Sequence, residues 1–243
     1  ENDLSDIMFT SGTTGTPKGV MMAHGQTLKL FTDWCDFADL REGDRYLIVN
    51  PFFHMFGYKA GWLACLVRGA TILPMPVFDV ATVLATVERE KVTVLPGAPT
   101  IYQSLLDSPD VDRFDLSSLR VAVTGAADIP VALIERIRAD LPFERVLTGY
   151  GLTECTGAAT MSRHDDPISK IARTSGRPLP DIEVRVVDDE MEELPRGEQG
   201  EIVIRGYAVM LGYFDEPEQT ATAVDADGWL RTGDLGVMDK DDY

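Results

Sequence analysis

Residues 10–19 read Thr-Ser-Gly-Thr-Thr-Gly-Thr-Pro-Lys-Gly, and this is the most informative stretch of the chain. It combines hydroxyl side chains, three glycines and one lysine directly after the apolar residues 7–9, which predict a strand. Glycines let backbone amides face an anion, hydroxyls donate to phosphate oxygens, and lysine supplies a compact positive charge. The stretch therefore predicts a loop that binds polyphosphate.

The Walker loop of nucleoside triphosphatases is the obvious comparison, with Gly, four residues and then Gly-Lys-Ser/Thr. Counted from Gly12, Lys18 is in register, but Pro17 replaces the second glycine and Gly19 replaces the metal-binding hydroxyl. Pro17 also has no N–H to donate and fixes φ. We infer a phosphate loop of another class, with an ordinary Ser/Thr/Gly-rich surface turn as the alternative.

The composition describes an acidic globular protein. Its 243 residues are 44% hydrophobic and carry a net charge of −18 at pH 7, which argues against nucleic acid or an anionic membrane surface as a partner. No apolar run reaches transmembrane length. Cys35, Cys65 and Cys155 fit neither a disulfide framework nor a zinc pattern and favour a reducing cytoplasm.

Short β-branched runs alternate with amphipathic runs from residue 45 onward. Strands are predicted at 46–50, 70–73, 92–95, 119–123 and 145–147, and helices at 57–67, after Asp79, at 100–106 and at 131–141. This alternation predicts an α/β domain with a parallel sheet flanked by helices, residues 1–172. Alternating residues 182–187 and 201–204 predict a smaller, mainly antiparallel β lobe, residues 173–243.

Three polar clusters follow predicted strands or turns, where open parallel sheets bind ligands. Residues 124–127 (Thr-Gly-Ala-Ala) leave room for a flat ring, although a tight strand-to-helix turn explains them equally well. Residues 149–154 (Gly-Tyr-Gly-Leu-Thr-Glu) offer an aromatic face, a hydroxyl and a carboxylate suited to a base, a phosphate and Mg²⁺. Residues 231–234 (Arg-Thr-Gly-Asp) offer a carboxylate for a ribose diol. Either of the last two could alone be an ordinary turn.

The phosphate loop and these clusters closely resemble the signatures of the adenylate-forming superfamily, which includes acyl-CoA synthetases, firefly luciferase and the adenylation domains of peptide synthetases. The Gly-Arg-Pro element at 176–178 and the Gly-Glu step at 200–201 also match in order. Five signatures in order cover nearly the whole chain. The chain therefore resembles the large N-terminal domain of that superfamily, including its β lobe.

The resemblance implies a role for each matching residue. It implies that the phosphates of ATP contact Thr10, Ser11, Gly12, Thr13, Thr14, Gly15 and Lys18. It implies that the adenine and acyl sites are lined by Gly125, Ala126, Ala127, Gly149, Tyr150 and Gly151. It further implies that Thr153 contacts the α-phosphate, that Glu154 holds Mg²⁺ and that Asp234 binds the ribose hydroxyls.

The implied reaction has two steps. A carboxylate attacks the α-phosphorus of ATP to give an acyl-adenylate and pyrophosphate, and a thiol, usually coenzyme A, then displaces AMP. An anion attacks a polyanion in the first step, so Mg²⁺ and the hydroxyl-rich loop offset the repulsion. Lys18, His54, Thr153 and Glu154 are the expected catalytic residues.

The substrate site is expected at residues 51–57 (Pro-Phe-Phe-His-Met-Phe-Gly). Phe53 stands where amino-acid-activating members carry an aspartate, which disfavours an ammonium-bearing substrate. Phe53, His54, Phe56 and Gly57 favour an apolar acid, with His54 beside its carboxylate, although a lone histidine is more often a core residue. The chain most resembles actinobacterial CoA ligases for a fatty acid or for the propanoate side chain of a partly degraded steroid.

Three further expectations follow. The superfamily's N-terminal subdomain and its mobile C-terminal lid, which carries the adenylation lysine, have no counterpart here, so we expect this polypeptide alone to be feebly active. A non-catalytic nucleotide-binding relative and an adenylating enzyme with another acceptor remain alternatives. A P-loop phosphotransferase would need the Walker geometry that Pro17 and Gly19 deny.

Overall fold

The computed structural model describes residues 1–10 and 17–243. They form two compact units. The first, here called the β unit, comprises Glu1–Leu30, Gly151–Thr160 and Arg177–Tyr243. The second, the α/β unit, comprises Phe31–Tyr150 and Met161–Gly176.

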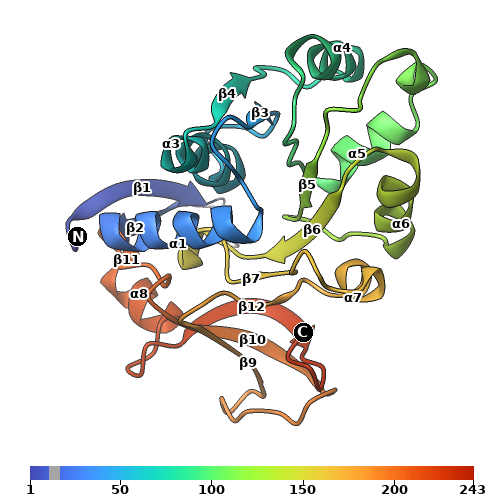
Figure 1. Ribbon diagram of the computed structural model, residues 1–243. Helices are drawn as coiled ribbons and strands as arrows, with labels where there is room; N and C mark the ends of the chain where they lie inside the picture. The colour runs from blue at the N-terminus through green and yellow to red at the C-terminus, as the bar shows by residue number, and fades with distance from the viewer. Residues whose placement is uncertain (11–16) are drawn as a thin grey trace. The chain divides into compact units, whose positions relative to one another are not determined.

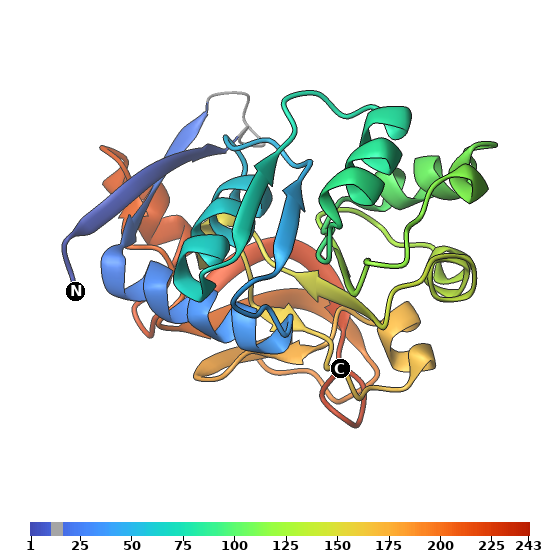
Figure 2. The same cartoon turned by 45° about the horizontal axis from the view of Figure 1, so that its top comes forward.

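The α/β unit is built on the parallel strands β3 (Arg45–Ile48), β4 (Thr71–Pro74), β5 (Val121–Thr124) and β6 (Arg145–Tyr150). β3 pairs in parallel with β4, side by side in Figure 2, and β5 pairs in parallel with β6. Val94 joins the two pairs through parallel bridges to Tyr46 and Val121. The predicted parallel sheet is therefore confirmed.

The predicted strand at 92–95 is reduced to isolated bridges. Leu47 N donates to Val94 O at 3.0 Å and Leu95 N donates to Val121 O at 3.0 Å, so the segment is bonded on both sides. Pro96 follows at once and has no N–H to continue the ladder. The segment fills the centre of the sheet without forming a longer strand.

Helices cover this sheet. They are α4 (Val80–Glu90), α5 (Pro99–Leu106), α6 (Val131–Asp140), α7 (Ile168–Arg173) and the short 3₁₀ helix η2 (Val111–Arg113). Asp79 caps α4 as predicted, accepting a hydrogen bond from Thr82 N at 2.8 Å. Figure 1 shows α5 and α6 beside β5 and β6, and Tyr102, Ile134 and Val146 lie in the core cluster between them.

The predicted helix at 57–67 is interrupted by a π-helix. Its parts are α2 (Met55–Gly57), the π-helix η1 (Tyr58–Leu63) and α3 (Ala64–Arg68). A Cβ on Gly57 would lie 2.2 Å from Pro51 O, so only glycine permits this approach of the first turn to the preceding loop. Single π turns in helices are frequent at functional sites.

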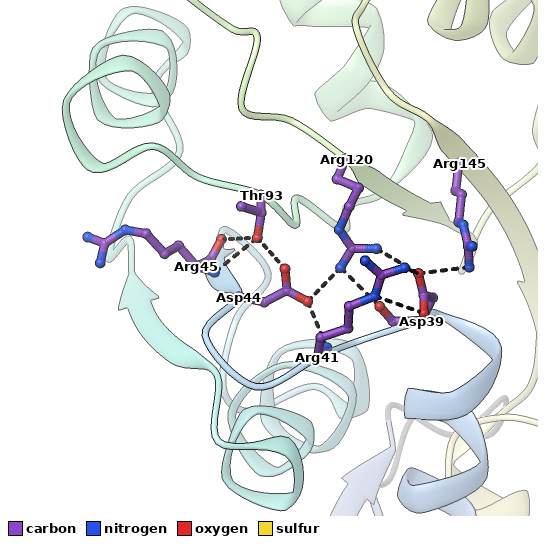
Figure 3. Close-up of polar contacts among 7 residues, drawn as sticks. All are labelled: Asp39, Arg41, Asp44, Arg45, Thr93, Arg120 and Arg145. Carbon is purple, nitrogen blue, oxygen red and sulfur yellow. Dashed lines mark hydrogen bonds and ion pairs between the residues drawn. The ribbon is translucent and has the colours of Figure 1, made fainter.

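Charged residues tie the amino ends of the parallel strands together, as Figure 3 shows. Arg120, just before β5, reaches Asp44 at 2.6 Å and Asp39 at 2.9 Å, and Arg145 at the start of β6 reaches Asp39 at 2.9 Å. Thr93 Oγ1 donates to Asp44 Oδ1 at 2.7 Å. Because the strands are parallel, this network lies at the edge opposite to the loops that follow β5 and β6.

The β unit contains two antiparallel sheets. One has the order β1 (Leu4–Thr10), β2 (Lys18–Ala23) and β11 (Gly212–Tyr213). The other has the order β12 (Leu230–Val237), β10 (Gln199–Gly206) and β9 (Ile182–Val187), coloured orange to red in Figure 1. The second sheet confirms the predicted antiparallel strands.

The remaining elements are α1 (His24–Phe37), the 3₁₀ helix η3 (Thr153–Cys155), β7 (Thr160–Met161), β8 (Arg177–Pro178) and α8 (Pro217–Ala223). The two short strands, β7 and β8, follow β6 in the order of its sheet. The expected domains 1–172 and 173–243 stay a prediction, since the compact units are discontinuous and group the first 30 residues with the C-terminal strands. None of the helices in the described ranges combines the length and apolarity that crossing a membrane requires.

Candidate functional site

The predicted site residues divide between the two units. The β unit holds Thr10, Lys18, Gly151, Thr153, Glu154 and Asp234. The α/β unit holds Phe53, His54, Phe56, Gly57, Gly125, Ala126, Ala127, Gly149 and Tyr150. Ser11, Gly12, Thr13, Thr14 and Gly15 lie outside the described residues.

The predicted phosphate loop connects two antiparallel strands. Thr10, the last residue of β1, pairs with Lys18, the first residue of β2. A Walker loop instead connects a strand to the helix whose N-terminus binds the phosphate. The strand pairing therefore agrees with the sequence in excluding a Walker loop.

Tyr213 links Lys18 to Glu154 within the β unit. The Tyr213 hydroxyl donates to Glu154 Oε1 at 2.8 Å, and Lys18 Nζ lies 4.9 Å from the centroid of the same ring. Burial, together with the neighbouring Glu154 charge, raises the pKa of Tyr213 well above its ordinary value, so the phenol stays a donor. The fold thus brings together the lysine of the loop and the predicted cation ligand.

The backbone around Glu154 is fixed by the segment that precedes β11. Met210 N donates to Glu154 O at 2.8 Å, and Thr156 Oγ1 donates to Ala208 O at 2.7 Å. Cys155 packs inward between them, and burial raises the pKa of its thiol to about 12. Cys155 is therefore a packing residue.

The donors around Glu154 fit a magnesium ion. Tyr213 occupies one carboxylate oxygen, and no hydrogen bond to the other is present among the residues described. The described ranges contain no group of three His, Cys, Asp or Glu that could hold a metal. Magnesium in nucleotide sites commonly takes one or two carboxylates and completes its shell with phosphate and water, so a single glutamate suffices.

Asp234 lies on a bulge of β12. Glu201 pairs with Leu235 and Val203 pairs with Arg231. Between these two pairs the chain advances two residues on β10 and four residues on β12, so the extra residues of β12 form the bulge. Such bulges re-aim side chains at sheet edges. Gly233, at the centre of the bulge, has φ +75°, a backbone conformation that favours glycine.

Glu201 holds this bulge in place, and sequence reasoning assigned it no role. Its carboxylate accepts from Gly233 N at 3.0 Å and from Arg231 Nη2 at 2.6 Å. Thr232 Oγ1 donates to Ile202 O at 2.7 Å and fixes the other side of the turn. Glu201 appears in the Gly-Glu signature at 200–201, but only the strand register reveals that it faces the turn before Asp234.

The loop after β5 closely approaches the last residues of β6 in the α/β unit. A Cβ on Gly125 would lie 2.8 Å from Gly149 O, so glycine is needed for this contact. Ala126 has φ +64°, a conformation that a non-glycine residue adopts only at a cost of about 1–3 kcal/mol. The fold therefore brings two predicted nucleotide-binding segments, residues 125–127 and the β6 residues 149–150, together at the carboxyl edge of the sheet.

His54 caps the first turn of α2. Its Nδ1 accepts from Phe56 N at 3.1 Å, which leaves Nε2 as the protonated nitrogen of the neutral ring. Nearby protein groups desolvate the imidazole and lower the pKa of His54. The ring is therefore neutral at pH 7 and can donate from Nε2.

The neighbouring aromatic residues are little packed. The Phe53 side chain is 82% exposed and that of Phe52 is 49% exposed. Tyr58 and Trp62 stack on the π-helix with ring centroids 5.5 Å apart. Exposed apolar side chains gathered at one loop are typical of a surface that binds an apolar ligand.

Two further predicted residues lie in the turn at residues 151–156. Thr153 begins η3, and its carbonyl accepts from Thr156 N at 2.9 Å. A Cβ on Gly151 would lie 2.5 Å from Ala158 Cα, so Gly151 is required for packing of the turn. Whether either residue also contacts a ligand stays a prediction.

Comparison with known proteins identifies the family. The sequence profile described as "AMP-binding enzyme" matches residues 1–214. The chain is 56% identical, over its whole length and 45% of the relative's, to the 3-(7a-methyl-1,5-dioxo-octahydro-1H-inden-4-yl)propanoyl:CoA ligase of Rhodococcus jostii RHA1. It is 54% identical, over 98% of its length and 45% of the relative's, to the enzyme of that name in Mycobacterium tuberculosis H37Rv. The chain thus spans about half the length of these relatives.

Solved structures with the same fold include two adenylate-forming enzymes. The inhibitor-bound N-terminal domain of FACL13 from Mycobacterium tuberculosis is 33% identical with a TM-score of 0.90, over all of this chain and 60% of that one. ATP-bound MatB from Rhodopseudomonas palustris is 31% identical with a TM-score of 0.92, over all of this chain and 47% of that one. The predicted fold class is confirmed by these similarities.

Proposed function

This chain belongs to the AMP-binding enzyme family, and on that premise we propose that the whole protein is an ATP-dependent, AMP-forming acyl-CoA ligase. The observation that carries the proposal is the contact of Tyr213 with both Lys18 and Glu154. It supports a site in which the lysine of a hydroxyl-rich loop and a carboxylate serve the same polyphosphate.

The first step is the attack of a carboxylate on the α-phosphorus of ATP, with pyrophosphate as the leaving group. In this proposal the hydroxyls of the loop and Lys18 bind the phosphates that leave, and Thr153 contacts the α-phosphate. Preorganised donors of this kind stabilise the charge that develops during the reaction. Asp234, re-aimed by the bulge, binds the ribose hydroxyls, and residues 125–127, Gly149, Tyr150 and Gly151 line the adenine and acyl sites.

Glu154 is the residue that we propose to hold Mg²⁺. When bound, the ion neutralises phosphate charge and lowers the repulsion between the acid and ATP. The Glu154 oxygen that accepts no hydrogen bond within residues 1–10 and 17–243 supports this assignment.

The second step is displacement of AMP by the thiol of coenzyme A. A neutral His54, with Nε2 as donor, supports a role in orienting the acyl carboxylate without adding a charge. The exposed aromatic ring of Phe53 and the neighbouring Phe56 and Gly57 support an apolar acid.

The acid that we propose is a bicyclic propanoate derived from a steroid ring system. The two relatives with 56% and 54% identity bear the name of a ligase for such an acid. A 4-coumarate–CoA ligase of Arabidopsis thaliana is 37% identical, which makes an aromatic acid a weaker candidate.

Three buried, unpaired cysteines support a reducing compartment such as the cytoplasm.

The test is CoA-ester formation by the whole protein with three acids at equal concentration. They are the bicyclic 3-(7a-methyl-1,5-dioxo-octahydro-1H-inden-4-yl)propanoate, a medium-chain fatty acid and 4-coumarate. We expect the highest kcat/KM for the bicyclic acid. A higher kcat/KM for the fatty acid would reject the bicyclic acid as the substrate but would leave the proposed ligase activity standing. ATP binding without a CoA ester from any of the three would instead favour a non-catalytic relative.

A further inference from the structure

We propose that Tyr213 is a positioning residue that fixes the Glu154 carboxylate for a divalent cation. The inference rests on the proposed function, because it concerns the same phosphate-binding site. Its basis is the hydrogen bond of 2.8 Å from the Tyr213 hydroxyl to Glu154 Oε1. A carboxylate that accepts a hydrogen bond on one oxygen from a fixed donor presents its second oxygen in one orientation.

Tyr213 is itself held rigidly. It pairs with Val20 of β2, and its N–H donates to Thr220 Oγ1 at 2.8 Å. The next residue, Phe214, donates from its N–H to Gly19 O at 2.7 Å. The side chain is only 7% exposed, so its hydroxyl has little freedom to leave Glu154.

β2, the strand with which Tyr213 pairs, begins directly after the phosphate loop. β2 starts at Lys18, and its second residue, Gly19, receives the bond from Phe214. A Cβ on Gly19 would lie 2.8 Å from Ile7 and 3.3 Å from Phe214, so the three segments are closely packed there. Tyr213 therefore couples the position of the Glu154 carboxylate to the end of the phosphate loop.

Two contacts of Tyr213 can be separated by substitution. The hydroxyl contacts Glu154, whereas the ring lies under Lys18. Tyr213→Phe removes the hydroxyl and keeps the ring. An effect of this variant on a cation thus reports the contact with Glu154 rather than the one with Lys18.

The experiment measures Mn²⁺ binding to the whole protein by electron paramagnetic resonance, with Mn²⁺ in place of Mg²⁺ and a non-hydrolysable ATP analogue at saturation. We expect Tyr213→Phe to weaken Mn²⁺ binding about 10-fold or more, as is typical when a residue that orients a metal ligand is lost. Tyr207→Phe is the matched control: its ring stacks on Lys29 in the same unit, and we expect unchanged Mn²⁺ affinity.

A double-mutant cycle distinguishes positioning from a general loss of structure. In the Glu154→Gln background, Tyr213→Phe should cause no further loss of Mn²⁺ affinity, because the carboxylate that it orients is absent. Should Tyr213→Phe fail to fold, Glu154→Gln alone must still weaken Mn²⁺ binding about 10-fold or more.

Wild-type affinity in folded Tyr213→Phe, or in Glu154→Gln, overturns the proposal. That result would leave the proposed ligase activity intact if the wild type forms CoA esters. A weakened Mn²⁺ affinity in a protein that forms no CoA ester would keep the positioning role and reject the ligase.

Discussion

Thr10 and Lys18 pair across an antiparallel hairpin, so the two ends of the phosphate loop are held opposite each other by strands. In a Walker loop the phosphates are bound at the start of a helix, whose dipole and free N–H groups supply much of the attraction. No helix begins at Lys18, which is the first residue of a strand. In the proposed site, the loop's backbone amides and hydroxyls together with Lys18 would supply the binding that a helix N-terminus supplies elsewhere.

Lys18→Ala should lower kcat for acyl-adenylate formation about 100-fold, the loss typical for one group that stabilises developing charge. The measurement is acid-dependent ATP–pyrophosphate exchange by the whole protein. Lys29→Ala is the control, since Lys29 is an equally cationic residue of the β unit that pairs with Asp181 at 3.0 Å. Equal rates for Lys18→Ala and wild type would contradict the role of Lys18.

Glu201→Gln should raise KM for ATP about 5-fold, because the turn that presents Asp234 loses a charge-assisted hydrogen bond worth about 1 kcal/mol. Glu183→Gln removes a carboxylate from the same sheet, where it pairs with Arg205 at 2.8 Å, and should leave KM unchanged. Steady-state kinetics at saturating acid provide the comparison. A matching change in both variants would mean that the sheet, not the turn, is affected.

Gly125→Ala should destabilise the protein by about 1–3 kcal/mol, because its Cβ would be forced to 2.8 Å from Gly149 O. Ala126→Gly should change stability by less than about 1 kcal/mol, since glycine adopts φ +64° without strain. Urea denaturation of both variants tests this pair. A larger loss in Ala126→Gly than in Gly125→Ala would show that the backbone geometry of the loop is misassigned.

Stability should fall in acid partly through Asp39. Although burial opposes the effect, the hydrogen bond from Arg41 and the charges of Arg145, Arg41 and Arg120 lower the pKa of Asp39. A lowered pKa in the folded state contributes stability above the unfolded-state pKa of about 3.9 and loses it as pH falls through the folded-state value. The network in Figure 3 is therefore expected to weaken below about pH 4.

Asp39→Asn should remove this part of the acid dependence. Its urea midpoint should fall below that of the wild type at pH 7, and the two midpoints should converge toward pH 3. Asp110→Asn is the control, because Asp110 pairs with Arg113 at 2.7 Å on the exposed 3₁₀ helix η2. A constant difference between Asp39→Asn and wild type across pH would contradict the linkage.

The sequence was most informative where a single continuous segment contains the whole pattern that predicts an element. The hydrophobic periods predicted α4, α5 and α6 and the strands β9 and β10, which the structure confirms. The phosphate loop that the composition of residues 10–19 predicts stays a prediction. The strand at 92–95 was overestimated, since Pro96 and the neighbouring strands limit it to single bridges. The π-helix within 57–67 was missed because its pattern of apolar residues does not differ from that of an α-helix.

Residues that act through a partner far along the chain could not be found from the sequence. Tyr213 is 59 residues from Glu154, and Glu201 is 32 residues from Gly233. The Glu201–Gly233 pair depends on the register of β10 and β12, and the Tyr213–Glu154 pair depends on how the segment before β11 packs on η3. Local patterns encode neither. The side chains proposed to position the site are therefore visible only in the folded chain, whereas those proposed to bind directly lie in recognisable motifs.

The most direct test of the central proposal is the fate of the ATP phosphates. The whole protein, supplied with ATP, Mg²⁺ and its acid but no coenzyme A, should exchange labelled pyrophosphate into ATP and should lose this exchange when the acid is omitted. Release of orthophosphate at the same rate with and without acid would contradict an adenylate-forming enzyme.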